Sequence, residues 1–156
     1  GQDTGVEPVT DDPLGAVVER VLSELEAITD AGSGSVIVEA DEIAAAAAAA
    51  SGLVRSVRPR EGKIEVVLIS SNYPRLFLYP EVDPATGRMR VTTKVEPPGI
   101  LGVVEVKIDP TLLPGLGPLL ERGQDALNAE LERRRLRPSS VVITDAGVLV
   151  DFAGAP

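Results

Sequence analysis

The chain has 156 residues, 44% of them hydrophobic and only 3% aromatic, which is enough for one compact domain with an aliphatic core. Its formal net charge of −9 argues against a nucleic-acid partner, because phosphate binding needs a basic surface. Cysteine and histidine are both absent, which excludes disulfides, thiolate nucleophiles, zinc fingers and histidine-based acid–base catalysis.

The two ends of the chain read as loose segments around a single domain. Residues 1–10 are polar and predict a flexible arm, residues 11–152 the domain, and residues 153–156 a frayed tail. The sequence opens "GQDTGVEPVTDDP" without methionine, which favours an excised export signal and a location outside the cell or at its envelope. A trimmed cytoplasmic protein is the alternative. No apolar run reaches the ~18 residues of a membrane span, so we expect no transmembrane segment.

The first half of the chain predicts two helices with a short strand between them. An apolar stripe from Leu14 to Ile28 predicts a helix that begins at Pro13. "SVIVEADEI" then predicts a strand that leads into a second helix, in which residues 44–50 are all alanine. Because small side chains allow close approach, this helix is expected to pack on a concave sheet or to form one wall of an acyl-chain cavity.

The second half predicts antiparallel strands and a long helix. "KIEVVLIS" (63–70) is a strand, residues 74–96 form a hairpin about a turn at Asp83–Gly87, and Pro74 and Pro80 suggest an edge or bulged strand. "VVEVKID" is another strand, a helix spans about residues 116–136, and "SVVITDAGVLVDF" folds back at residues 145–147. We therefore expect a single α+β domain with a strongly curved antiparallel sheet packed against two or three helices.

Two apolar connections and one basic cluster are the candidate binding features. "PPGILG" (97–102) and "TLLPGLGPLL" (111–120) indicate a core lid or a contact surface for a lipid, another ligand or a partner. Their bulky residues are Ile100, Leu101, Leu112, Leu113 and Leu116. In "ERRRLRP" (132–138), helix-dipole stabilisation of about 0.3–1 kcal/mol per cation explains the arginines. Alternatively, Arg134 and Arg137 bind an anionic headgroup.

Nothing in the sequence predicts catalysis. The serine pairs at residues 70–71 and 139–140 and the three lysines lie in no nucleophile motif, and no EF-hand spacing occurs. We expect no enzyme activity, no metal and no cofactor.

The order of elements resembles the small exported bacterial lipid-binding proteins of the LmeA-like kind and, more distantly, the tubular lipid-binding (TULIP) superfamily. The resemblance covers about residues 35–152 and rests on "VIVEADEI", "ALNAEL", "VVITDAGVLV" and the apolar connections. It implies a non-catalytic domain that binds a lipid or other apolar ligand at the cell envelope. The alternative is an envelope scaffold or protein-interaction domain with a fully packed core.

Overall fold

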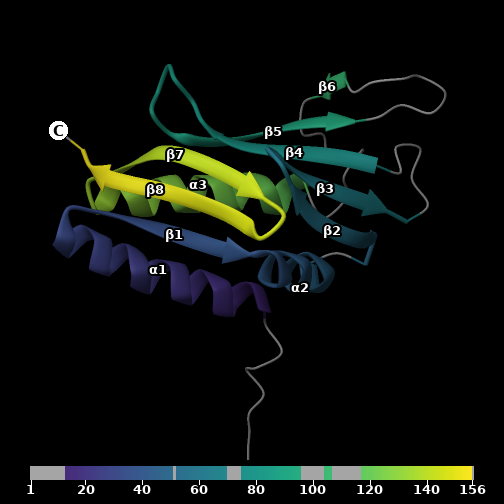
Figure 1. The fold of residues 1–156 in the computed structure, drawn as a ribbon, viewed down its shortest axis with the longest axis horizontal. Helices are drawn as coiled ribbons and strands as arrows, with labels where there is room; N and C mark the ends of the chain where they lie inside the picture. The colour runs from purple at the N-terminus through teal and green to yellow at the C-terminus, as the bar shows by residue number, and fades with distance from the viewer. Residues whose placement is uncertain (1–12, 51, 70–74, 96–103, 107–116, 156) are drawn as a thin grey trace, which may run out of the picture.

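The computed structural model describes residues 13–50, 52–69, 75–95, 104–106 and 117–155. Within them the chain forms three helices and eight strands, and the strands form two antiparallel sheets (Figure 1). The predicted α+β class, with antiparallel strands and three helices, is confirmed. The strands that were expected in one curved sheet divide between two hydrogen-bonded sheets.

Each sheet has a simple strand order. The smaller sheet has the order β1-β8-β7, with β1 at Ser33–Glu39, β7 at Leu136–Thr144 and β8 at Gly147–Gly154. The larger sheet follows chain order, with β2 at Val54–Arg60, β3 at Lys63–Leu68, β4 at Arg75–Val82, β5 at Met89–Val95 and β6 at Val104–Val106. The helices are α1 (Pro13–Ala31), α2 (Ala40–Ala50) and α3 (Gly117–Arg133).

The smaller sheet joins the two ends of the described chain. β1 pairs with β8 from Ser33↔Ala153 to Glu39↔Gly147, and β8 pairs with β7 across the predicted tight turn. Gly147 has φ of 151°, and a Cβ there would lie 2.2 Å from the carbonyl oxygen of Val38. The third turn residue must therefore be glycine, because any side chain would push β1 and β8 apart.

The larger sheet confirms the predicted hairpin and adds a strand that was not predicted. β4 and β5 pair from Leu76↔Val95 to Val82↔Met89 about the turn at residues 83–88. An edge or bulged strand was predicted at Pro74 and Pro80. Pro74 lies outside the described residues, and β4 lies between β3 and β5, but at Pro80 it pairs only with β5, as at the edge of a sheet. Pro80 is tolerated because β3 pairs only as far as Leu78, so no strand is hydrogen-bonded to β4 on that side of the proline. The strand that was not predicted is β2, at the edge of the sheet.

The inner faces of both sheets share one aliphatic core. One cluster joins the smaller sheet to β3, β4 and β5, and a second joins it to α1, α3 and the β4–β5 hairpin. Half-buried Val141 and Val150 pack against both clusters. As Figure 1 shows, α3 lies behind β7 and β8, so the helix that positions the site described below is fixed against the core.

The alanine helix lies at the side of the molecule. α2 packs against α1 and β2, and Ile43 contacts the core, but none of the described α2 side chains is fully buried. Ala46 and Ala47 are half-buried and their alanine neighbours on both sides are exposed. The structure therefore differs from the expectation of a helix nested in a concave sheet.

Two amide side chains of α3 complete the open edge of β5. β6 pairs only with residues 93–95, so the backbone groups of Met89 and Val91 need other partners. Asn128 accepts a hydrogen bond from the Met89 N–H (3.0 Å) and donates one to the Met89 carbonyl (2.9 Å). Gln124, one turn earlier, accepts from the Val91 N–H at 2.9 Å. These bonds fix α3 beside the hairpin.

Candidate functional site

An open cavity of about 380 Å³ lies where the β4–β5 turn, the C-terminal part of α3 and the start of β7 meet. Leu131, Leu136 and Pro138 form the apolar part of its wall, beside backbone and polar groups of the turn. This volume lies at the lower end of the range for small-molecule sites. The cavity is therefore large enough for a polar headgroup but too small for a complete lipid.

Three guanidinium groups and one carboxylate surround this cavity. Arg88 comes from the hairpin, Arg135 from the α3–β7 connection and Arg137 from β7. Glu132 is the only acidic residue of the lining, and its carboxylate lies 3.4 Å from Arg88. Arg135 and Arg137 form no ion pair within the described part of the chain. Three cations against one anion give the lining a net charge of +2, in a protein whose net charge is −9.

Local backbone geometry brings these arginines together. Arg135 has φ of 55°, a left-handed conformation that ends α3 and turns the chain into β7. Gly87 also has positive φ (73°), and its N–H donates to the Asp83 carbonyl at 2.7 Å. A Cβ at Gly87 would lie 3.6 Å from a guanidinium nitrogen of Arg137, so the hairpin turn passes close to β7. The end of α3 and the turn therefore meet at this site.

Of the two arginines predicted to bind a headgroup, the structure places only Arg137 at the cavity. Arg134 instead connects α3 to α1 through ion pairs with Glu26 (2.7 Å) and Glu130, and its side chain is only 8% exposed. Hydrogen bonds from Arg133 and Arg134 hold the pKa of Glu130 below its usual value. A structural role thus accounts for Arg134, whereas Arg137 remains a candidate ligand-binding residue.

The five apolar residues predicted to line or gate a groove, at positions 100, 101, 112, 113 and 116, lie outside the described residues. Their ligand role stays a prediction. Leu116 directly precedes α3, which has 17 residues and is therefore about 25 Å long. The arginine cavity lies at the opposite end of this helix.

Sequence reasoning did not select Arg88 or Arg135 as site residues. Arg88 lies in a turn, where charged residues are expected, and its position beside α3 depends on the folding of the whole hairpin. Arg135 belongs to the basic cluster and was explained by the helix dipole alone. The spacing of Gln124 and Asn128 puts both amides on one face of α3, and the structure shows this face bound to the backbone of β5.

The described residues contain no group of three or more acidic residues placed to hold a metal ion. Among the helices that the structure describes, none is both long and apolar enough to cross a membrane. Comparison with known proteins gave no match to a family model, to a curated protein or to a solved structure.

Proposed function

We propose that this domain is a non-catalytic binding module for an anionic amphiphile such as a lipid, and that it works at the cell envelope after export. The observation that carries the proposal is the convergence of Arg88, Arg135 and Arg137 on one cavity with an apolar wall. The resemblance of the predicted element order to that of the exported lipid-binding proteins named above also supports it.

The charge of the cavity favours an anionic ligand. Three guanidinium groups close together repel one another, and only one carboxylate of the lining compensates. A bound phosphate or carboxylate would relieve this repulsion, and guanidinium groups bind such anions with two hydrogen bonds each. The carboxylates of α1 and α2 disfavour anions on the helical side of the molecule, whereas the cavity is a favourable place for a negatively charged headgroup.

The apolar wall favours an amphiphile over a free inorganic anion. Leu131, Leu136 and Pro138 offer hydrophobic contact directly beside the arginines. In our proposal the acyl part leaves the cavity and extends along α3. A ligand that touches both ends of α3 must be about 25 Å long, which is of the order of one lipid with its headgroup, since a bilayer core of about 30 Å holds two chains end to end.

To test this, the protein is purified without detergent and then extracted with organic solvent. Mass spectrometry of the extract identifies any bound lipid. We expect anionic lipid in the extract of the native protein and much less in the double variant Arg135→Gln/Arg137→Gln. The matched control is Arg122→Gln/Arg133→Gln, which removes two exposed cations of α3 that do not line the cavity. Equal lipid content in both variants would refute the cavity as the headgroup site.

A second candidate function is an envelope scaffold or protein-interaction domain. It is favoured by an apolar row across the smaller sheet, in which Ile37, Leu149 and Val142 are register partners. Ile37 is 41% and Val142 48% exposed, which is unusual for large aliphatic side chains on neighbouring strands. A lipid-free extract of the native protein would favour this second function.

A further inference from the structure

The outer face of the larger sheet carries a concentration of basic residues that the cavity does not explain. Strand register puts Arg58, Glu65, Phe77 and Lys94 in one row across β2, β3, β4 and β5. Alternation along the strands adds further cations to the same face. Together the cations of this face are Arg58, Arg60, Lys63, Arg75, Arg90 and Lys94.

These six cations outnumber the carboxylates of the same face. Strands β2 to β5 contribute Glu65 and Glu81 to it, so the outer face of these four strands has a net charge of 6 − 2 = +4. Since the whole chain has a net charge of −9, the rest of the protein has −13. We call the outer face of β2 to β5 the basic sheet face.

The carboxylates of this region neutralise only part of it. Glu65 lies between Arg60 (3.1 Å) and Arg75 (3.2 Å). Arg90 pairs with Glu81 (2.5 Å) and with Asp83 (3.5 Å), which comes from the turn after β4.

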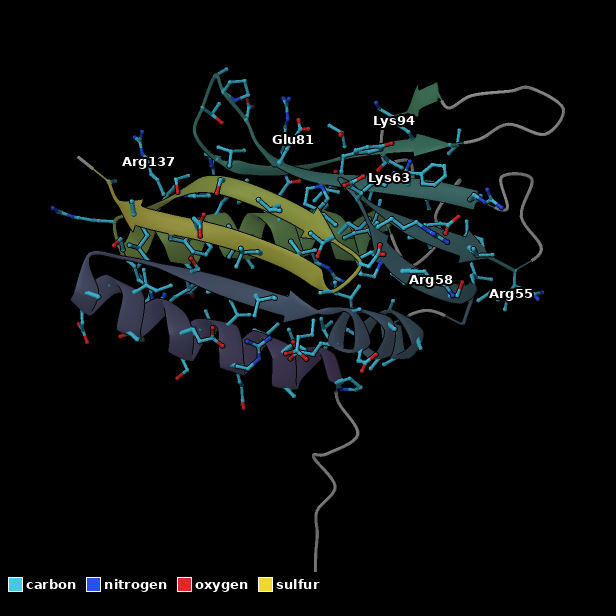
Figure 2. All side chains as sticks on the ribbon, in the orientation of Figure 1. Arg55, Arg58, Lys63, Glu81, Lys94 and Arg137 are labelled. Carbon is cyan, nitrogen blue, oxygen red and sulfur yellow. The ribbon has the colours of Figure 1, made fainter. Side chains whose placement is uncertain are left out.

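Arg58, Lys63 and Lys94 have no carboxylate partner within the described residues. Figure 2 shows these three spread over the larger sheet, at the opposite end of the molecule from Arg137. The basic sheet face and the arginine cavity are therefore separate sites.

Two aromatic rings hold the lysines against the sheet. The Lys63 ammonium lies 5.0 Å from the centre of the Phe77 ring, and the Lys94 ammonium lies 4.6 Å from the centre of the Tyr79 ring. Such cation–π contacts limit the freedom of the lysine side chains, whose aliphatic parts cover the rings. Phe77 is accordingly only 7% exposed although it lies on the outer face. The two lysine ammonium groups are thus held close to the outer face of the sheet before any partner binds.

The acidic residues concentrate on the helices instead. α1 carries four carboxylates, at Glu19, Glu24, Glu26 and Asp30, against the single cation Arg20, and the first turn of α2 adds Asp41 and Glu42. Figure 1 places α1 on a different side of the molecule from β4 and β5. A protein with this asymmetry is oriented by a negatively charged surface, with the basic sheet face toward it.

We propose that the basic sheet face docks on the surface of an anionic lipid bilayer. An array of cations spread over four strands matches a surface that offers headgroups at every position, and each basic residue near such a membrane strengthens binding by about fivefold. Nucleic acid is the less suitable partner, because high affinity for it needs more phosphate contacts and a basic protein overall. The proposal does not depend on the cavity, since it concerns a different surface and lipid in a bilayer.

The test is vesicle co-sedimentation at low and high salt. Native protein should bind vesicles that contain about 30% phosphatidylglycerol, should not bind pure phosphatidylcholine vesicles, and should be released by salt. Arg58→Gln/Lys94→Gln should weaken binding roughly 25-fold, as two fivefold losses. The control Arg122→Gln/Arg133→Gln has the same net charge and should change binding by less than about threefold. Circular dichroism melting of both variants excludes unfolding as the cause.

Three results would overturn the proposal: no binding to the anionic vesicles, equal binding to phosphatidylcholine vesicles, or equal weakening by both double variants. Stronger binding to a single-stranded oligonucleotide than to the vesicles at the same salt would assign the face to nucleic acid. The cavity is tested separately, because Arg135→Gln/Arg137→Gln should lower the lipid content of the extract and leave vesicle binding within about threefold of the native value. Either proposal can therefore fail without the other.

Discussion

Replacing Asn128 with alanine should destabilise the protein more than any other single change of a polar residue on α3. Asn128 is 4% exposed, and its amide forms both hydrogen bonds that the Met89 backbone lacks. Asn128→Ala leaves a buried N–H and a buried carbonyl without partners, at a cost of about 1–3 kcal/mol each. We expect the free energy of unfolding to fall by about 2–4 kcal/mol, a large part of the 5–15 kcal/mol typical of a domain.

Urea denaturation followed by circular dichroism measures this loss. With a slope of about 1–3 kcal/mol per molar urea, the midpoint should fall by roughly 1–2 M. Gln124→Ala is the matched control, since Gln124 is half-buried and accepts only one hydrogen bond, from Val91. It should cost about 1 kcal/mol. An Asn128→Ala variant as stable as Gln124→Ala would refute the reasoning, because water would then replace the lost amide.

Asn128→Asp separates the lost donor from the lost volume. The carboxylate keeps the shape and can still accept from the Met89 N–H, but an ionised carboxylate cannot donate to the Met89 carbonyl. Burial next to a carbonyl raises a carboxyl pKa above its unfolded value, because the neutral form is favoured. The contribution of the protonated group is therefore present at low pH and is lost as pH rises through the raised pKa. The stability deficit of Asn128→Asp should shrink on acidification, whereas that of Asn128→Ala should not.

Three further predictions concern stability. Gly147→Ala should destabilise by more than about 3 kcal/mol, because the new Cβ meets the backbone of β1, whereas Gly62→Ala, in open space at positive φ, should cost about 1 kcal/mol in the same urea assay. Arg134→Ala should lower the free energy of unfolding by about 1–3 kcal/mol, because it removes a nearly buried cation that has two acidic partners. Arg133 is exposed, so Arg133→Ala should lower it by less than about 0.5 kcal/mol. Thermal melting of both variants measures the difference. Hydrogen bonds from two serine hydroxyls on β1 and β7 lower the pKa of Asp151. The stability that Asp151 contributes is therefore present above its unfolded pKa and is lost as pH falls through the lowered value. Asp151→Asn should reduce the loss of stability in acid, measured by unfolding at several pH values, and an unchanged pH profile would contradict this.

The helices and hairpins could be predicted because their signals are local. The apolar stripe of α1 and the turn residues at 83–87 and 145–147 identify these elements within about 20 residues of sequence. The end of α3 was harder to predict: the structure ends the helix at Arg133, whereas the sequence suggested residue 136. A left-handed arginine at position 135 ends the helix there, and no glycine marks the site.

The division into two sheets could not be predicted, because strand pairing is not local. Each residue of β1 pairs with a residue of β8 that lies more than 100 positions later in the chain. β2 was missed because "VRSVRPR" has one proline and four polar or charged residues exposed, a pattern that resembles a loop. Pairing with β3 along one side is what makes it a strand.

The candidate site was predicted only where one residue carried the signal. Arg137 lies in a basic cluster that stands out in an acidic chain, so sequence alone selects it. Its neighbours at the cavity arrive from the β4–β5 turn and from the end of α3, and their meeting depends on the contact between Asn128 and Met89. Loss of Asn128 should thus disturb the site as well as the stability, although its side chain has a structural role.

The basic sheet face and the arginine cavity predict a division of tasks that one experiment can separate. If the sheet face docks the protein on a membrane and the cavity holds the headgroup of an extracted lipid, then transfer of lipid between vesicles needs both sites. Binding of a short-chain anionic lipid in free solution needs only the cavity. Arg58→Gln/Lys94→Gln should then slow transfer and leave the affinity for the short-chain lipid unchanged within about threefold, because its charges lie at the other end of the molecule. Arg135→Gln/Arg137→Gln should reduce both. Reduced short-chain binding by the sheet-face variant would mean that the two sites are coupled through the protein, and the division of tasks would be wrong.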